Sequence, residues 1–344
     1  MTERMLASLL QPFAPFLADP ETIEIVVNRP HEIGVEARGQ WTWHPADLSY
    51  DHLEAIGILS AFQTSQELSP AHPIVTAKIP TGQRIHINRP PATAPGIVSI
   101  DIRQPTAQAP TVAALAKTGM FTTRQNTPPA ADLVSSLGVD LGFNLADDLG
   151  HQLAYRLVEA VHQRRNILIA GATNTGKTTL AQALIAIIPL LERIITVEDT
   201  PEWNRLPHHN RVALYYSKGE QGTAAIRPEE LLEASLRMRP DRVLMGELRD
   251  GAAWTYLRSI VAGHPGCITT LHANSAEGAF NALRLMMRQN QEGRTMPDDV
   301  ITGLLRDLVD IVVHLERDKD QIHVTSVYER RAAGADRPDN TGLL

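Results

Sequence analysis

The chain has 344 residues, of which 43% are hydrophobic and 21% charged, with a formal net charge of -7 and a pI near 6.0. These values are ordinary for a soluble protein, and the length predicts about two domains. The acidic balance argues against a dedicated nucleic-acid binder, although it allows a local basic patch. The one cysteine, Cys267, excludes a disulfide scaffold and a four-cysteine zinc site within one chain, and it favours a cytosolic protein.

The first 104 residues predict a mixed α/β domain with an antiparallel sheet. Near the N-terminus, apolar residues recur at helical spacing and predict a helix that packs one face on the core. They are Leu6, Leu9, Leu10, Phe13 and Leu17. A helix on a membrane surface is the alternative, and it is disfavoured because the polar face is not basic. Alternation over 22–45 predicts a hairpin or meander, followed by a helix over 50–62 and strands over 74–79, 84–87 and 97–102.

Prolines mark the end of this first domain. Pro105, Pro110, Pro128 and Pro129 stand among alanine, threonine and glutamine. This composition is typical of a linker. We therefore expect a domain over 1–104 and a linker over 105–146, with a short helix near 112–117.

From residue 147 to 330, apolar strands alternate with helices. This order predicts a mostly parallel sheet that helices cover on both faces. The expected strands are 166–170, 193–197, 212–216, 242–245, 267–271 and 311–315. The expected helices are 148–163, 179–188, 228–238, 250–262, 275–289 and 298–308. The tail, 331–344, is rich in Gly, Asp and Pro and is expected to be disordered.

A phosphate-binding loop is the most informative motif of the chain. The run Gly171-Ala172-Thr173-Asn174-Thr175-Gly176-Lys177-Thr178 fits the pattern G-x-x-x-x-G-K-[ST]. It lies between a predicted strand and a predicted helix, so backbone N–H groups and the helix dipole can face an anion. Lys177 would contact the β- and γ-phosphates, and the Thr178 hydroxyl can bind Mg²⁺. We expect residues 171–178 and Thr179 to hold ATP; a glycine turn without a ligand is the alternative.

Carboxylates follow two of the predicted strands. Glu198 ends one strand and Glu202 stands four residues later, while Glu247 follows another. Ligands of such sheets bind at the carboxyl ends of the strands, where these acids could orient a water molecule or support a metal ion. Gly246 occupies the position where many phosphate-loop ATPases carry an Asp that supports Mg²⁺. Mg²⁺ would then depend on Thr178, phosphates and water, or on an acid such as Glu198 acting through water.

Two histidines flank the strand predicted over 267–271. His272 ends the strand, where an imidazole could sense a γ-phosphate. His264 lies on the preceding turn, where a structural role and a functional role are equally good interpretations. The two do not form an evident zinc site. Cys267 is interpreted as a packed side chain.

An arginine often stabilises phosphoryl transfer, commonly from another domain or subunit. The candidates are Arg237, Arg239 and Arg242 in the second domain and Arg84 and Arg103 in the first. Composition cannot choose among them, and any of them can be a solvated surface residue.

Four motifs occur in the order of the secretion traffic ATPases. They are the phosphate loop, Ile195 to Glu202, Gly246 to Arg249 and Gly263 to Ala273. They look like the Walker A, Asp-box, Walker B and His-box segments of that superfamily, in which the missing Asp before Glu247 is normal. The first domain, with Val27 to Glu32 and Gly82-Gln83-Arg84, resembles the soluble hexameric ATPase of type IV secretion and conjugation systems.

The resemblance implies a fold and roles for particular residues. The fold would be a PAS-like N-terminal α/β domain and a RecA-like phosphate-loop domain. Glu247 would polarise water, and Glu198 and Glu202 would support water and Mg²⁺. His272 would sense the γ-phosphate. Arg84 and Arg103 would reach the phosphates from the first domain.

The resemblance also implies a function. The chain would be an ATP-hydrolysing homohexameric motor that powers substrate transfer and pilus assembly. Its partners would be other secretion components, and it would be cytoplasmic and peripheral to the inner membrane. The alternatives are an assembly or retraction ATPase of the type II/type IV pilus branch, or a nucleotide-gated docking platform with little turnover.

Overall fold

The structure is a computed structural model, and it describes residues 2–37, 40–104, 110–121, 149–198, 203, 206–216, 226–319 and 321–330. The described residues form two compact units, the first up to residue 104 and the second from residue 110 onward. Most of the expected linker and the whole expected tail lie outside the described residues. No described helix is both long enough and apolar enough to cross a bilayer.

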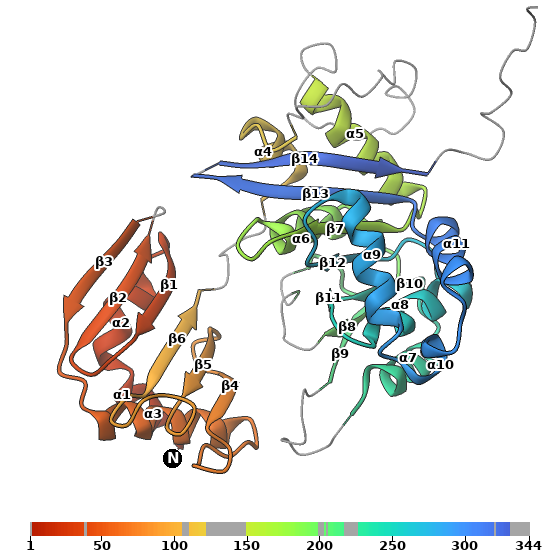
Figure 1. The fold of residues 1–344 in the computed structure, drawn as a ribbon. Helices are drawn as coiled ribbons and strands as arrows, with labels where there is room; N and C mark the ends of the chain where they lie inside the picture. Colours follow the sequence, from red (N-terminus) through yellow and green to blue (C-terminus); the bar gives the residue numbers. More distant parts are fainter. Residues whose placement is uncertain are drawn as a thin grey trace, which may run out of the picture. The chain divides into compact units, whose positions relative to one another are not determined.

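The first unit contains a six-stranded antiparallel sheet in the order β3-β2-β1-β6-β5-β4 (Figure 1). The strands are β1 (Thr22–Val27), β2 (Glu32–Ala37), β3 (Gln40–Pro45), β4 (Ile74–Lys78), β5 (Arg84–Asn88) and β6 (Ser99–Arg103). One face is apolar and packs on the core, as the alternation predicts. Ile25, Ile85 and Ile102 lie opposite one another on this face and are fully buried.

Helices cover that apolar face. They are α1 (Thr2–Leu9), the 3₁₀ turn η1 (Gln11–Phe13), α2 (Ala14–Ala18) and α3 (Tyr50–Gln63). Leu6, Leu10 and Phe13 are buried in the same core, which favours the core-packing interpretation of the N-terminal segment. The segment is not one continuous helix, because Pro12 and Pro15 cannot donate the backbone hydrogen bonds that a longer helix would need.

The second unit has two sheets, one of them built around β7 (Ile167–Gly171). The five-stranded sheet has the order β11-β12-β7-β13-β14 and the three-stranded sheet the order β10-β8-β9, and every pair is parallel except β13 with β14. The other strands are β8 (Ile194–Glu198), β9 (Arg211–Tyr215), β10 (Arg242–Met245), β11 (Glu247–Leu248), β12 (Ile268–Leu271), β13 (Ile311–Asp318) and β14 (Gln321–Glu329). The parallel arrangement therefore agrees with the prediction.

Gly246 connects these two sheets. β10 pairs with β8, and directly after Gly246 the same chain pairs with β12 as β11. The Gly246 N–H donates to the Val197 carbonyl at 2.9 Å, and its own carbonyl accepts from the Thr269 hydroxyl at 2.5 Å. Neighbouring strands thus stay together across the interruption, and Glu247 projects from a fixed backbone.

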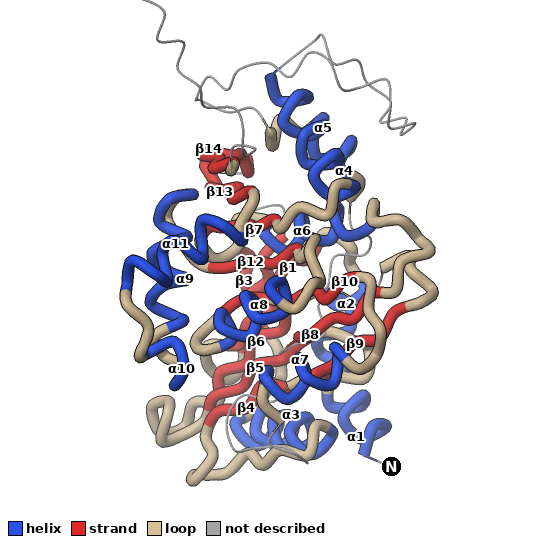
Figure 2. Tube along the Cα trace, turned by 90° about the vertical axis from the view of Figure 1, so that its right-hand side faces the viewer, coloured by secondary structure: helices blue, strands red, loops and turns tan. Residues whose placement is uncertain are grey.

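Helices flank the sheets of the second unit (Figure 2). They are α4 (Val112–Lys117), α5 (Leu149–His162), α6 (Lys177–Ala186), α7 (Pro228–Leu236), α8 (Ala252–Val261), α9 (Ala276–Met287), α10 (Gln291–Arg294) and α11 (Asp298–Leu308). The helices α8, α9 and α11 pack against one another, and α4, α5 and α6 form a second group. The two groups line two separate hydrophobic clusters.

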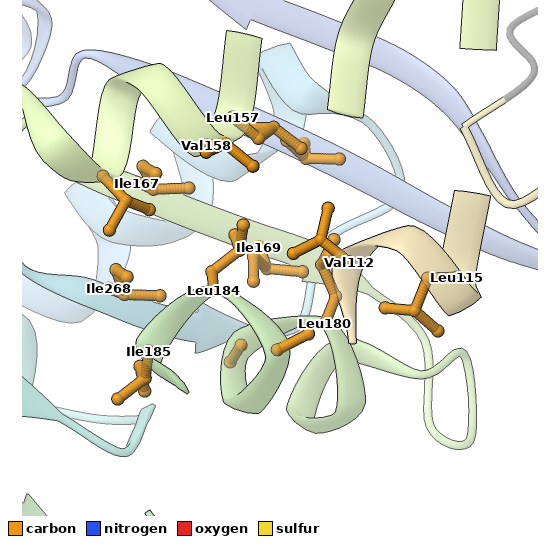
Figure 3. Packing of buried hydrophobic residues seen from close by; sticks show 14 of the residues in the cluster. Val112, Leu115, Leu157, Val158, Ile167, Ile169, Leu180, Leu184, Ile185 and Ile268 are labelled. Carbon is orange, nitrogen blue, oxygen red and sulfur yellow. The ribbon is translucent and has the colours of Figure 1, made fainter. Parts of the chain in front are cut away.

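Helix α4 lies within the range expected as a linker, yet it belongs to the core of the second unit. Val112 and Leu115 pack with Leu180 of α6 and Ile169 of β7, as Figure 3 shows. The apolar face of α4 explains this position, since its burial is favourable only against another apolar surface. The helix lies at the residues predicted for it, whereas β14 and α10 were not predicted.

Candidate functional site

The phosphate-binding loop joins β7 to α6. Gly171 ends the strand with φ 157°, and Gly176 precedes the helix in a left-handed conformation with φ 79°. A Cβ on Gly171 would lie 2.5 Å from the Leu315 carbonyl oxygen, and one on Gly176 would lie 3.1 Å from Ile322. Both positions therefore require glycine, for space at Gly171 and for conformation at Gly176.

Lys177 lies inside this loop. Its side chain is almost fully buried, and Nζ donates to the carbonyls of Gly171 at 3.0 Å and Ala172 at 2.7 Å. The Thr175 hydroxyl also donates to the Ala172 carbonyl, at 2.9 Å. The Lys177 ammonium group therefore lies at the N-terminus of α6. An anion bound at this helix end would face both the ammonium charge and the positive end of the helix dipole.

Glu247 lies beside His272 at the same edge of the sheet. The register aligns Glu247 with Thr270 and Leu271 with Ala170, so His272 and the phosphate loop leave adjacent strands at one level. The His272 Nε2 atom is 2.6 Å from Oε1 of Glu247, and Arg249 donates to Oε2. The buried Oε1 atom accepts no hydrogen bond within the described part of the chain, so it can accept one from a water molecule.

The pKa of His272 reports its proximity to the loop. Burial lowers the pKa most, the Lys177 and Arg249 charges lower it further, and Glu247 and a hydrogen bond to the Gly171 backbone raise it. The net shift is downward, so the imidazole is neutral at pH 7 and can donate one hydrogen bond. The structure thus brings together Lys177, Glu247 and His272, although Lys177 precedes Glu247 by 70 residues and Glu247 precedes His272 by 25.

Glu198 is the second predicted acid that the structure describes, at the carboxyl end of β8. It is 1% exposed; Oε1 accepts from the Thr196 hydroxyl at 2.6 Å and Oε2 from the Trp203 N–H at 3.1 Å. A Cβ on Gly246 would lie 3.8 Å from the Glu198 Cγ, so this carboxylate borders the place where an Asp side chain would begin. Glu202 lies outside the described residues.

Comparison with known proteins decides the family. A family model described as type II/IV secretion system protein matches residues 66–319. The chain belongs to this family. It is 40% identical over 339 residues to the type IV secretion system protein VirB11 of Bartonella quintana, covering 95% of this chain and 93% of the relative. It is 37% identical over 326 residues to VirB11 of Brucella suis, covering 93% and 88%.

A solved structure supports the fold. The X-ray structure of the Legionella pneumophila ATPase DotB matches with a TM-score of 0.60 at 14% identity, over 94% of this chain and 80% of that one. Together with the VirB11 relatives, the family places the chain among the type IV secretion ATPases of the secretion traffic superfamily. Membership of this family confirms the prediction, made from the phosphate loop and its acids, that the chain is an ATPase.

In this secretion ATPase the second-unit arginines do not gather at the phosphate loop. Arg239 is exposed and stands before β10, whereas Glu247 follows the opposite end of that strand. Arg237 is exposed and donates to the Glu233 carbonyl at 3.2 Å. Arg242 is fully buried and forms a two-pronged ion pair with Glu192, at 2.7 and 3.2 Å, so it is structural.

The first-unit arginines lie directly opposite each other on β5 and β6. Arg84 pairs with Arg103, and Arg103 also pairs with Glu24 on β1. These residues occupy the sheet face away from the core. Burial raises the pKa of Glu24 most, while Arg103 lowers it and Asp101 raises it. Two cations directly across a strand pair repel each other, and Glu24 beside Arg103 offsets part of that repulsion.

Two other residues settle open interpretations. Cys267 is buried, and burial raises the pKa of its thiol to about 12, so the group is a packed thiol and not a nucleophile. Arg249 was not predicted as part of the site, although it pairs with Glu247. Its position two residues later on an extended chain, and therefore on the same side, was the available signal.

Proposed function

We propose that this chain is an ATP-hydrolysing homohexameric motor that powers substrate transfer and pilus assembly by a type IV secretion system. The observation that carries the proposal is the meeting of Lys177, Glu247 and His272 at one edge of a parallel sheet. A cation for phosphate, a base for water and a neutral donor are the parts that hydrolysis of a triphosphate needs. The VirB11 relatives connect that chemistry to secretion.

We also propose the finer features of fold and assembly. The second unit is RecA-like, which the placement of β12 between β7 and β11 in a parallel arrangement supports. The first unit, over 1–104, is PAS-like. The second domain covers 147–330, and α4 (Val112–Lys117) adds to its core. The partners are a ring of identical subunits and other secretion components, and the protein works in the cytoplasm at the inner membrane.

Residues 171–179 suit the triphosphate of ATP. The loop offers backbone N–H groups, the Lys177 ammonium and the start of α6, and all three favour anions. The Thr178 hydroxyl would bind Mg²⁺, which when bound neutralises phosphate charge. Glu198 would hold a water molecule of that ion, because its two oxygens keep acceptor capacity beyond the bonds from Thr196 and Trp203. Glu202 is assigned the same supporting role on the resemblance alone.

Hydrolysis then depends on Glu247. Its Oε1 atom takes a proton from the attacking water as the water oxygen bonds to the γ-phosphorus, and the bond to the ADP oxygen breaks. The products are ADP and inorganic phosphate. Arg249 donates to Oε2 and holds the carboxylate in place, while His272 Nε2 lies 2.6 Å from Oε1. When the γ-phosphate is bound, the single N–H of neutral His272 would turn to that group, which links its presence to the chain after β12.

Replacing Lys177 with Ala tests the motor directly. Loss of a fixed cation at the phosphates should lower kcat by about 10²- to 10³-fold. Lys117→Ala removes an exposed lysine from the end of α4 and is expected to leave turnover unchanged. The measurements are phosphate release and the mass of the assembly with and without Mg-ATP. Wild-type turnover no higher than that of Lys177→Ala, even with membranes and partners, favours a docking platform; a monomer under all conditions contradicts the ring.

Arg84 and Arg103 are proposed to contact the phosphates of the bound nucleotide. Removal of an arginine that stabilises phosphoryl transfer costs about 10³-fold or more in kcat. Arg84→Ala and Arg103→Ala should therefore lower kcat while the circular dichroism spectrum stays unchanged. Lys78→Ala is the matched control, since Lys78 is exposed and lies opposite Arg84 on the next strand. Unchanged kcat and KM in both arginine variants would remove them from the site, and Arg239 of another subunit would become the candidate.

A further inference from the structure

The antiparallel hairpin of β13 and β14 lies beside β7, because β13 pairs with both strands (Figure 1). Leu315 of β13 pairs with Gly171, and Ile322 of β14 lies against Gly176, so the hairpin supports the phosphate loop. The same hairpin reaches the segment after β12. The Ser326 hydroxyl accepts from the Ala276 N–H at 3.0 Å, where α9 begins.

A β-bulge directs one further contact to that segment. His314 pairs with Ser326, but Leu315 pairs with Val324, so Thr325 is an extra residue in β14. A bulge redirects the side chain of the extra residue, and bulges are frequent beside active sites. Here the Thr325 hydroxyl lies 2.6 Å from Nδ1 of His314, on the neighbouring strand.

The other ring nitrogen of His314 reaches the residue after His272. Its Nε2 atom is 3.2 Å from the Ala273 carbonyl oxygen. Because a carbonyl only accepts, Nε2 carries the hydrogen, and Nδ1 of the neutral ring accepts from Thr325. The ring is 2% exposed, and burial lowers its pKa more than the Ala273 carbonyl and Glu316 raise it. The neutral imidazole therefore connects the bulge to Ala273 through one hydrogen bond on each ring nitrogen.

We propose that His314, oriented by Thr325, is a positioning residue that holds His272 against Glu247 and the phosphate loop. Fixing the Ala273 carbonyl restricts the backbone rotation that would move the preceding side chain. The inference rests on the proposed role of His272. It assigns to β14, which lies on the far side of β13 from β7, a part in catalysis without contact with the nucleotide.

Two pairs of variants test this role. His314→Leu removes the donor to Ala273, whereas His314→Gln keeps an N–H at a similar reach. Thr325→Val removes the hydroxyl at nearly constant volume, whereas Thr325→Ser keeps it. Since misplacement of about 1 Å can cost on the order of 10²-fold, His314→Leu should lower kcat about 10- to 100-fold with little change in KM for ATP. Thr325→Val should lower kcat less than His314→Leu does. His314→Gln and Thr325→Ser should keep most of the wild-type kcat.

A double-mutant cycle separates positioning from general loss of packing. If His314 acts through His272, His314→Leu should lower kcat no further in a His272→Ala background. An equal loss of kcat in both backgrounds, or Gln and Ser variants as impaired as Leu and Val, would overturn the inference. Where His272→Ala is too slow for a further loss to be measured, the Thr325 pair decides. A His272→Ala protein with wild-type kcat would instead refute the role proposed for His272 itself.

Discussion

Glu247→Gln is expected to lower kcat by about 10²- to 10⁴-fold while Mg-ATP binding persists, because a general base contributes about this much. The amide has nearly the volume of the carboxylate but cannot take a proton from water. Its oxygen can still accept from Arg249, which donates to Oε2 in the present chain. The phosphate loop, which supplies the binding contacts, is unaltered by the substitution.

Steady-state phosphate release and the affinity for a fluorescent nucleotide measure the two effects separately. Asp250→Asn is the matched control, because it makes the same change of acid to amide on an exposed residue three positions later. Asp250 has φ 50°, a conformation that Asn tolerates well. A Glu247→Gln kcat within about twofold of wild type would contradict its role as base. An equal loss in Asp250→Asn would show that kcat responds to any charge removed from this segment.

The elements of the second unit were predictable because their signals are local. A buried parallel strand is a continuous apolar run, and Val243 and Leu244 of β10 or Leu168 of β7 show this directly. The phosphate loop was predictable for the same reason, since its glycines and Lys177 are contiguous. β14 was missed because polar residues interrupt it, and most of its side chains are only half-buried.

The remaining parts of the site depend on contacts between distant residues. The spacing of Glu247 and His272 in the sequence does not give their distance of 2.6 Å, which follows from the pairing of β11 with β12. Arg239 is separated from Glu247 by the length of β10, which it precedes, although the local sequence made all three predicted second-unit arginines equivalent. Only the partner of Arg242, fifty residues earlier in the chain, reveals that this arginine is structural.

Arg242→Met should therefore be the most destabilising substitution proposed for this chain. The guanidinium is fully buried, with two bonds to Glu192 and donors to the carbonyls of Val161 at 2.8 Å and Gly266 at 3.4 Å. Removing one partner of a buried ion pair costs about 3–5 kcal/mol. Arg164 also pairs with Glu192, at 3.3 Å, so the carboxylate keeps part of its compensation and the loss should lie at the lower end of this range. That is a large share of the roughly 5–15 kcal/mol that stabilises a typical domain.

Urea unfolding followed by circular dichroism measures this loss, and Arg237→Met is the control. Arg237 is exposed, so its substitution should change the free energy of unfolding by about 0.5 kcal/mol or less. Adding Glu192→Leu to Arg242→Met should recover part of the loss, since no charge of the pair then stays buried. Equal midpoints for Arg242→Met and Arg237→Met would contradict the structural role. Arg242 lies at the end of β10 opposite to Glu247 and does not belong to the site. Arg242→Met should therefore lower turnover only through the fraction of the second unit that it unfolds.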